Sequence, residues 1–277
     1  MTTSIHSNHF KFQKQAGNIN LVSDTIKVIL MDTTFAFDKD THATLSSVTD
    51  HQLSTANGYT QNDSTLVVDT HTEDDSVDKA IMIYDDAAWT ASGGSIGPTG
   101  SACIINETAI EATELFTTEI DRTFTGGSTH WANDDIGTTF DETTDLSLVS
   151  DATGQYCLIT FTDIGTSLVA GGLYRLEYDY AETLAGFEFK INGAALQVLG
   201  DAVAGTDQYI DFYADESFTG VHELRIYSKT NAAASGDFDN FSLKELGTVI
   251  GCIDFETNYT ITDGTSFQIN AITLNDE

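Results

Sequence analysis

The stretch GDFDNFSLKELGTVIGCIDFE, residues Gly236–Glu256, places two strand-like runs of different character end to end. The first run, FSLKEL, alternates outward and inward residues, as a strand does when one of its faces is buried. The second run, TVIGCIDF, is almost entirely apolar, and a single glycine, Gly247, joins the two. This change of pattern without a linker predicts that two differently built modules meet at Gly247.

The segment before this junction, Ile110 to Leu246, contains enough strand-like runs for a complete β-sandwich. Each run shows a period of two or a short apolar block, and Gly, Asn or Asp closes it, as strands joined by tight turns require. We therefore predict an inserted module at 110–246. Its runs are LITFTDIG, LVAGGLYRLEYDYA, GFEFKING, YIDFYAD, GVHELRIYSK and GDFDNFSLKEL.

The flanks of this segment predict a second module. The last 31 residues hold two strand-like runs, TVIGCIDF and SFQINAITL, and are too short to fold alone. They need the first 109 residues as a partner, with the amphipathic opening from His9 to Ala16 and the runs TIKVILMD, STLVVDTHT, KAIMIYDD and SACIINET. We predict a discontinuous host domain at 1–109 plus 247–277, since insertions are tolerated where the two ends of a loop lie close together.

Composition and charge narrow the classes of function. Helix formers are scarce and Thr, Gly, Asp and Asn are common, which predicts a mainly β protein. The 43 Asp and Glu residues against 11 Lys and Arg give a net charge of −32, which disfavours nucleic acid and anionic lipid as partners. No apolar run approaches the ~20 residues of a membrane span, and we expect no membrane insertion and no secretion signal.

The three cysteines, Cys103, Cys157 and Cys252, are too few and too uneven in number for a disulfide framework. We expect buried, reduced thiols. Joining the two host segments would place Cys103 and Cys252 on adjoining strands.

Two resemblances to known families arise from the quoted residues. The host pattern, from FKFQKQAGNINLVSDTIKVILMDTTFAFDKD through AIMIYDDAAWTA and IGPTGSACIINET to VIGCIDFETNYTITDGTSFQINA, resembles a family of small proteins encoded among the structural genes of tailed bacteriophages. The insert, with LVAGGLYRLEYDY in its middle and DNFSLKEL at its end, resembles jelly-roll carbohydrate-binding modules. The predicted fold is therefore a small β-rich host domain with an inserted jelly-roll β-sandwich.

The resemblances imply a non-enzymatic virion structural protein. The first expectation is a capsid decoration protein that displays the sandwich on the exterior surface of the virion. Such a protein is assembled into the particle in the cytoplasm of the infected cell. Its partners would be the major capsid protein or other virion proteins, with cell-surface glycans and a homo-oligomer as further options. The alternatives are a tail or fibre-associated adsorption protein and a free carbohydrate-binding protein.

A structural calcium ion is a further implication, because jelly-roll binding modules often hold one between their first and last strands. Hard oxygen ligands from carboxylates suit this ion. The matching positions are Glu119 or Asp121 near the start of the insert and Asp239 near its end.

Sugar binding requires exposed aromatic rings, because the face of a pyranose stacks on Trp or Tyr. Trp131, in the polar stretch GGSTHWANDD, is the candidate for this contact. The alternative is that Trp131 packs as a lid on the sandwich core. Tyr178 and Tyr180 share one strand face with Leu176, which favours core packing for both.

The sequence contains a catalytic motif by its letters only. GGSIG, residues 93–97, has the letters of a nucleophile elbow, but Pro98, Thr99 and Gly100 follow it where a helix is needed. We interpret it as a glycine-rich loop, and adjacent acidic pairs such as Asp85–Asp86 and Asp134–Asp135 as solvated turns. His42, His51 and His130 lack the spacing of zinc ligands, and we expect them to be surface histidines. We expect no enzymatic activity.

Overall fold

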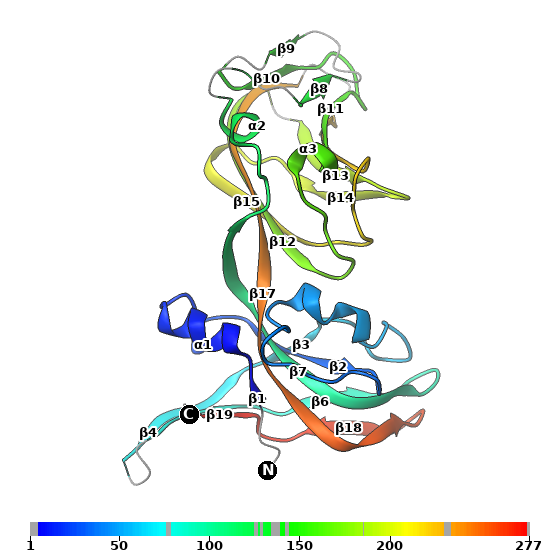
Figure 1. Cartoon of the computed structure of the whole chain (residues 1–277). Helices are drawn as coiled ribbons and strands as arrows, with labels where there is room; N and C mark the ends of the chain where they lie inside the picture. Colours follow the sequence, from blue (N-terminus) through cyan, green and yellow to red (C-terminus); the bar gives the residue numbers. More distant parts are fainter. Residues whose placement is uncertain are drawn as a thin grey trace. The chain divides into compact units, whose positions relative to one another are not determined.

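A computed structural model describes residues 5–75, 79–124, 127, 130–133, 139–141, 144–184, 186–229 and 234–275 (Figure 1). The described chain is mainly β, with four antiparallel sheets and a few short helices, which confirms the predicted fold class. It divides into two compact units, the host unit (1–110 and 246–277) and the inserted unit (111–245). Both boundaries fall one residue from the predicted positions.

The inserted unit is a β-sandwich of two antiparallel sheets. In the first sheet, β17 pairs with β12, and β12 pairs with β15. Strand β17 also pairs with β10, and β10 pairs with β9. The second sheet has the order β14-β13-β16-β11-β8. The strands of the first sheet are β12 (Leu173–Leu184), β15 (Gly205–Tyr213), β17 (Ser235–Ile261), β10 (Leu146–Val149) and β9 (Thr139–Asp141). Those of the second are β14 (Leu196–Asp201), β13 (Phe187–Asn192), β16 (Glu223–Ser228), β11 (Tyr156–Thr160) and β8 (Ala132–Asn133).

An aromatic cluster fills the space between these two sheets. Phe238 of β17 is fully buried, and its ring stacks on Tyr180 of β12 at 4.3 Å between centroids. Phe187 and Phe189 of the opposite sheet meet the Phe238 ring edge-on. Because alternate residues of each strand point inward, the period of two in the sequence has built this core. Two short helices, α2 (Glu119–Thr123) and α3 (Phe161–Ile164), complete the unit, and α3 takes the second half of the run LITFTDIG, which we had predicted as a strand.

The host unit contains the rest of the nine-stranded sheet to which β17 belongs, two smaller sheets and a helix. Its main sheet contains β3, β2, β7 and the second part of β17, with β1 paired to β17. A three-stranded sheet has the order β19-β5-β4, and β18 pairs with β6. The bounds are β1 (Ile5–His6), β2 (Ile26–Met31), β3 (Ser64–Leu66), β4 (Val68–Asp74), β5 (Lys79–Tyr84), β6 (Ala87–Thr90), β7 (Ile96–Glu114), β18 (Ser266–Ile269) and β19 (Thr273–Asn275), with 3-10 turns η1 (Leu45–Ser47) and η2 (Thr49–His51).

Helix α1 (Asn8–Gln15) occupies the stretch predicted to be amphipathic. It begins at Ser7, whose side chain accepts a hydrogen bond from the Phe10 backbone N–H at 2.9 Å and so satisfies one of the free donors of the first turn. Phe10 and Gln13 are buried, whereas Phe12 on the other side is exposed. The host unit has its own core, and the described core residues of the two units do not overlap.

The junction at Gly247 differs from the prediction. The two runs FSLKEL and TVIGCIDF do not form two strands, because β17 continues through Gly247 for 27 residues (orange in Figure 1). Gly247 has a φ of +92°, and a Cβ atom there would lie 2.9 Å from Cβ of Leu45. Glycine is therefore required at this position both by its backbone conformation and by the close approach of Leu45. The change of sequence pattern marks a change of module within one strand.

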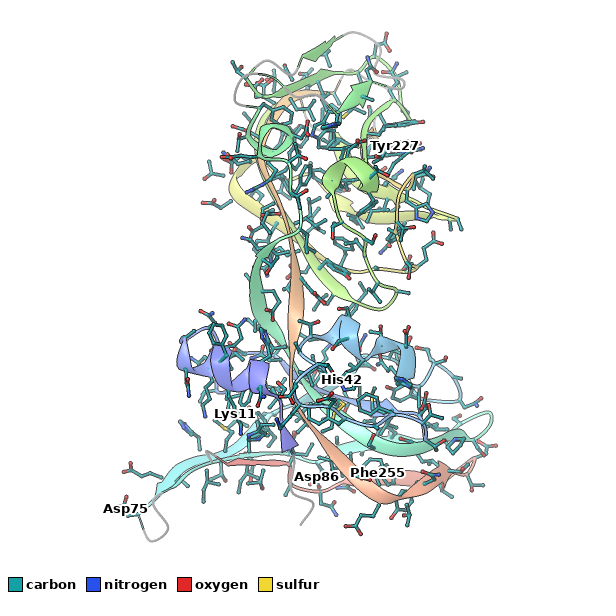
Figure 2. All side chains as sticks on the ribbon, in the orientation of Figure 1. Lys11, His42, Asp75, Asp86, Tyr227 and Phe255 are labelled. Carbon is teal, nitrogen blue, oxygen red and sulfur yellow. A yellow bond between two sulfur atoms is a disulfide. The ribbon has the colours of Figure 1, made fainter. Side chains whose placement is uncertain are left out.

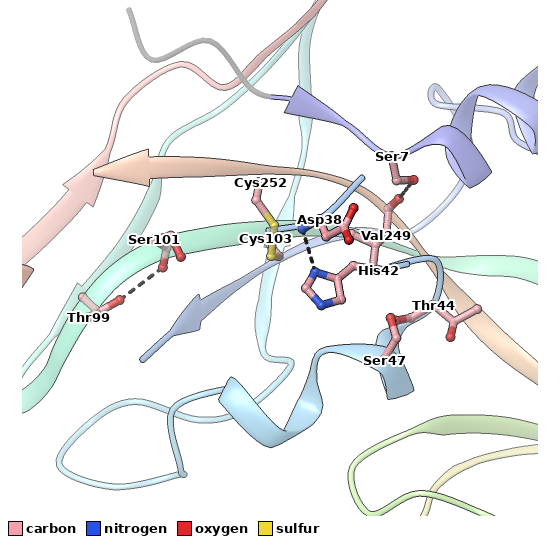
Figure 3. Close-up of a disulfide and its surroundings, with 10 residues drawn as sticks. All are labelled: Ser7, Asp38, His42, Thr44, Ser47, Thr99, Ser101, Cys103, Val249 and Cys252. Carbon is pink, nitrogen blue, oxygen red and sulfur yellow. Dashed lines mark hydrogen bonds between the residues drawn. A yellow bond between two sulfur atoms is a disulfide. The ribbon is translucent and has the colours of Figure 1, made fainter. Parts of the chain in front are cut away.

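The cysteines also differ from the prediction. Cys103 of β7 and Cys252 of β17 are direct partners in the register of these strands, as expected, but they form a disulfide (Figure 3). Their Cα atoms are 4.1 Å apart, close to the separation of a non-hydrogen-bonded antiparallel pair, which brings the two sulfur atoms within bonding reach. Cys157 is buried in the inserted unit and forms no disulfide. The expected adjoining strands are confirmed, whereas the expectation of reduced thiols, which rested on the small and odd number of cysteines, is wrong for this pair.

Candidate functional site

Among the inserted-unit residues whose burial the structure describes, the most exposed aromatic ring belongs to Tyr209 of β15, which is 56% exposed. Ile210 and Phe212 of the same strand point toward the core, so Tyr209 and Asp211 lie on the outer face. Their partners on β12 are Glu177 and Arg175. The outer face of this strand pair therefore carries an aromatic ring and three charged groups.

Arg175 holds this ring in place. Its guanidinium group lies 3.9 Å from the centroid of the Tyr209 ring and donates two hydrogen bonds to the Asp211 carboxylate, at 2.7 and 2.8 Å. The hydrogen bond from Arg175 to Asp211 raises the pKa of the guanidinium further, so the cation is permanent. We name Tyr209, Arg175 and Asp211 the Tyr209 platform. A ring supported from one side and exposed at the other is an ordered surface for stacking.

The second sheet carries a different aromatic arrangement on its outer face. Tyr156 of β11 and Tyr227 of β16 are direct partners, and their rings stack at 4.9 Å between centroids. Arg225 lies over Tyr156 at 4.1 Å, and Lys190 lies over Tyr227 at 4.2 Å. Figure 2 shows Tyr227 at the surface of this unit. Because cations and rings cover each other in this tyrosine ladder, its ring faces are less available to a ligand than that of Tyr209.

Trp131 is not an exposed platform. Only 4% of its surface is exposed, its ring packs on Phe241 at 5.1 Å between centroids, and its indole N–H donates to the Asp121 carbonyl at 2.9 Å. The prediction of a glycan contact at Trp131 is therefore wrong, and the alternative of a core lid holds. Tyr178 and Tyr180 are buried in the same core, as their strand pattern indicated.

The three residues predicted for calcium differ in their surroundings. Asp121 is fully buried, and its carboxylate contacts the Nδ1 atom of His130 at 2.6 Å, which raises the pKa of this histidine. Burial, together with the nearby charges of Asp179 and Asp145, raises the pKa of Asp239. Glu119 is exposed. In the described part of the chain, no group of three His, Cys, Asp or Glu side chains is placed to hold a metal ion, and the structural calcium ion stays a prediction.

The remaining predicted features have mixed outcomes. Ser95 of GGSIG precedes strand β7 rather than a helix, as the glycine-rich-loop interpretation requires. His42 and His51 are only half exposed and pack against Phe35, so they are not simple surface histidines. The pair Asp134–Asp135 lies outside the described residues. None of the helices in the described ranges is long and apolar enough to cross a membrane.

Comparison with known proteins gives little further identification. No protein-family model matches the chain, and no curated protein matches it either. Among solved structures, the chain is similar to the N-terminal cellulose-binding domain of β-1,4-glucanase C from Cellulomonas fimi. The sequence identity is 17%, the match covers 48% of this chain and 94% of that domain, and the TM-score is 0.23. At this TM-score the similarity carries no argument about function.

Proposed function

We propose that this protein is a non-enzymatic structural component of a tailed-bacteriophage particle, and that it decorates the exterior of the capsid. The support is the coincidence of two independent divisions of the chain. The segments that resemble the phage family, before and after the insert, belong to one compact unit, and the intervening segment forms a β-sandwich of its own. In this proposal the host unit binds the major capsid protein or another virion protein, and the inserted unit is displayed.

The test is the composition of purified particles. We expect the protein to remain with gradient-banded phage particles, with hundreds of copies per particle by quantitative mass spectrometry, because a decoration protein covers a repeating surface. A few copies per particle would instead assign it to the tail or its fibres, as an adsorption protein. Its presence only in the soluble lysate would contradict a virion role and favour a free carbohydrate-binding protein.

We further propose that the inserted unit contacts glycans through the Tyr209 platform. A pyranose ring can stack on the exposed face of Tyr209, while neighbouring polar groups bond to its hydroxyls. Asp211 is more than one-third exposed at its side chain and lies beside the ring, as such contacts require. The cation beneath Tyr209 fixes the ring before a ligand arrives, which lowers the entropy lost on binding.

Substitution of Tyr209 tests this second proposal. Tyr209→Ala should weaken binding of multivalent glycans by about tenfold, or ~1.4 kcal/mol, because the stacking surface is lost. Arg175→Gln should give a smaller loss, since the ring remains but its support is removed. Tyr259→Ala is the matched control, because Tyr259 is an exposed tyrosine of the host unit. A glycan array with the intact protein gives the measurement, and equal binding by the Tyr209 and Tyr259 variants would contradict the proposal.

A further inference from the structure

The host unit contains a cavity of about 380 Å³ between helix α1 and the three-stranded sheet. This volume falls within the ~300–1,000 Å³ range of small-molecule sites. Three neighbouring residues of that sheet line the cavity, namely His71 of β4, Met82 of β5 and Leu274 of β19. They are neighbours because His71 and Leu274 both pair with Met82. Phe10 of α1 and Ile19 add apolar surface. We name this cavity the helix pocket.

The surrounding contacts fix the walls of the helix pocket. The loop after α1 turns at Gly17, with a φ of +79°, and the Tyr84 hydroxyl donates to the Leu21 carbonyl at 2.8 Å. The Asn18 side chain donates to the Gln13 side chain at 2.7 Å. The loop that supplies Gly17 and Leu21 to the wall is therefore tied to α1 and to β5 by hydrogen bonds.

The rim of the helix pocket is basic in a very acidic protein. Lys14, His6 and His71 line it, and none of the described lining residues is acidic. The first 23 residues of the chain contain no Asp or Glu, although the whole chain has 43. The first carboxylate after them, Asp24, already accepts hydrogen bonds from the Asn20 backbone and the Asn106 side chain. An anionic group of a ligand can approach the Lys14 ammonium at this rim without meeting an acidic side chain among the described lining residues.

We propose that the helix pocket binds an apolar chain that ends in a carboxylate. The apolar part would lie against Phe10, Met82 and Leu274, and the carboxylate would lie at the rim near Lys14. Two sources share this chemistry, a free fatty acid and the carboxyl-terminal aliphatic residue of a polypeptide. The proposal concerns the host unit alone and does not depend on the glycan contact of the inserted unit.

Methionine methyl groups offer a direct readout of binding. The chain has three methionines, of which Met82 lines the helix pocket and Met31 is buried without lining it. With ¹³C-methyl methionine, the intact protein should show a saturable shift of the Met82 signal when octanoate is added, while Met31 stays in place. Octan-1-ol, which lacks the charge, should bind about fivefold more weakly. The affinity of a short peptide that ends in Leu-Leu, compared with that of octanoate, identifies which of the two sources binds more tightly. The same peptide with an amidated carboxyl terminus is its uncharged control.

Matched variants separate this site from general charge or hydrophobicity. Lys14→Gln should weaken octanoate about fivefold, whereas Lys11→Gln, at an exposed position of α1 that does not line the pocket (Figure 2), should change it less than twofold. Val22→Trp places an indole at the rim and should abolish the shift. Its control is Val67→Trp, since both valines are exposed but only Val22 lines the pocket.

An unchanged Met31 signal shows in each variant that the fold is intact. The proposal is overturned if neither octanoate nor the peptide gives a saturable Met82 shift. Equal affinities for octanoate and octan-1-ol, or equal effects of Lys14→Gln and Lys11→Gln, would also overturn it, because the pocket would then not select an anion.

Discussion

Replacing both Cys103 and Cys252 by alanine is expected to lower the free energy of unfolding of the host unit by about 3 to 5 kcal/mol. The disulfide joins the two segments of the host unit across a sequence separation of 149 residues, so the whole inserted unit lies inside the loop that it closes. In the loop-entropy account, a cross-link stabilises the fold by restricting the unfolded chain, and a longer loop gives a larger effect.

The size of the loss depends on whether the two units unfold together. If the whole chain unfolds at once, the loop has about 150 residues and the disulfide contributes about 5 kcal/mol. If the inserted unit stays folded, its ends remain paired, because the Leu115 N–H donates to the Leu243 carbonyl at 2.8 Å. The effective loop then has about 23 residues, and the contribution falls to about 3.4 kcal/mol. The measured loss therefore reports on the coupling between the units.

The two tryptophans of the chain make this measurement selective. Trp89 lies in the core of the host unit and Trp131 in the core of the inserted unit. Urea unfolding followed by fluorescence in a Trp131→Phe background reports the host unit alone, and a Trp89→Phe background reports the inserted unit. Cys157→Ala is the control for loss of a cysteine outside the disulfide. Equal stability of the host unit with and without the Cys103–Cys252 bond would contradict the prediction.

Most of the fold follows from the local pattern of the sequence. The period of two in LYRLEYDY places Tyr174, Leu176, Tyr178 and Tyr180 in the core, as expected for a strand with one buried face. The position of the insertion could also be predicted, because an alternating run is followed by an apolar run at Gly247. The continuity of β17 through Gly247 could not be predicted, because a glycine with a positive φ is more typical of a turn than of a strand interior.

The candidate site was less predictable than the fold. Alternation in YIDFY places Tyr209 opposite to the inward-facing Ile210 and Phe212, so this tyrosine could have been identified as outward-facing. Its support by Arg175 depends on the pairing of β12 with β15, which the sequence does not give. The burial of Trp131 could not be predicted, because its polar sequence neighbours indicate exposure, whereas tertiary contacts with Phe124 and Phe241 bury it.

A second prediction concerns the folding of the two units when they are separated. A chain that joins Ala109 to Gly247 through a four-residue Gly/Ser turn should fold without the inserted unit, and residues 110–246 should fold by themselves. The described cores of the units do not overlap, so each should keep its buried apolar contacts after separation. With 137 residues, the inserted segment also has the size of an independent domain.

The trimmed host chain should keep the hairpin that holds its two segments together. Asn106 pairs with Thr248 and Ser101 with Asp254, so the register on either side of the new turn is already antiparallel. The turn replaces a long connection, and loop-closure cost changes by only ~0.6 kcal/mol for each doubling of length. The disulfide would now close about 17 residues, and its reduction should still cost about 3 kcal/mol.

Circular dichroism and thermal melts of the two separate chains test this architecture. Each should show a cooperative transition, and reduction of the disulfide should lower the midpoint of the trimmed host chain but leave that of the inserted segment unchanged, because Cys157 has no disulfide partner. Phe238→Ala should destabilise the separate inserted segment as it does the same unit in the intact chain, since its ring contacts lie within that unit. If either separate chain is unfolded while the intact protein melts in one step, the strands β7 and β17 couple the units into a single folding domain.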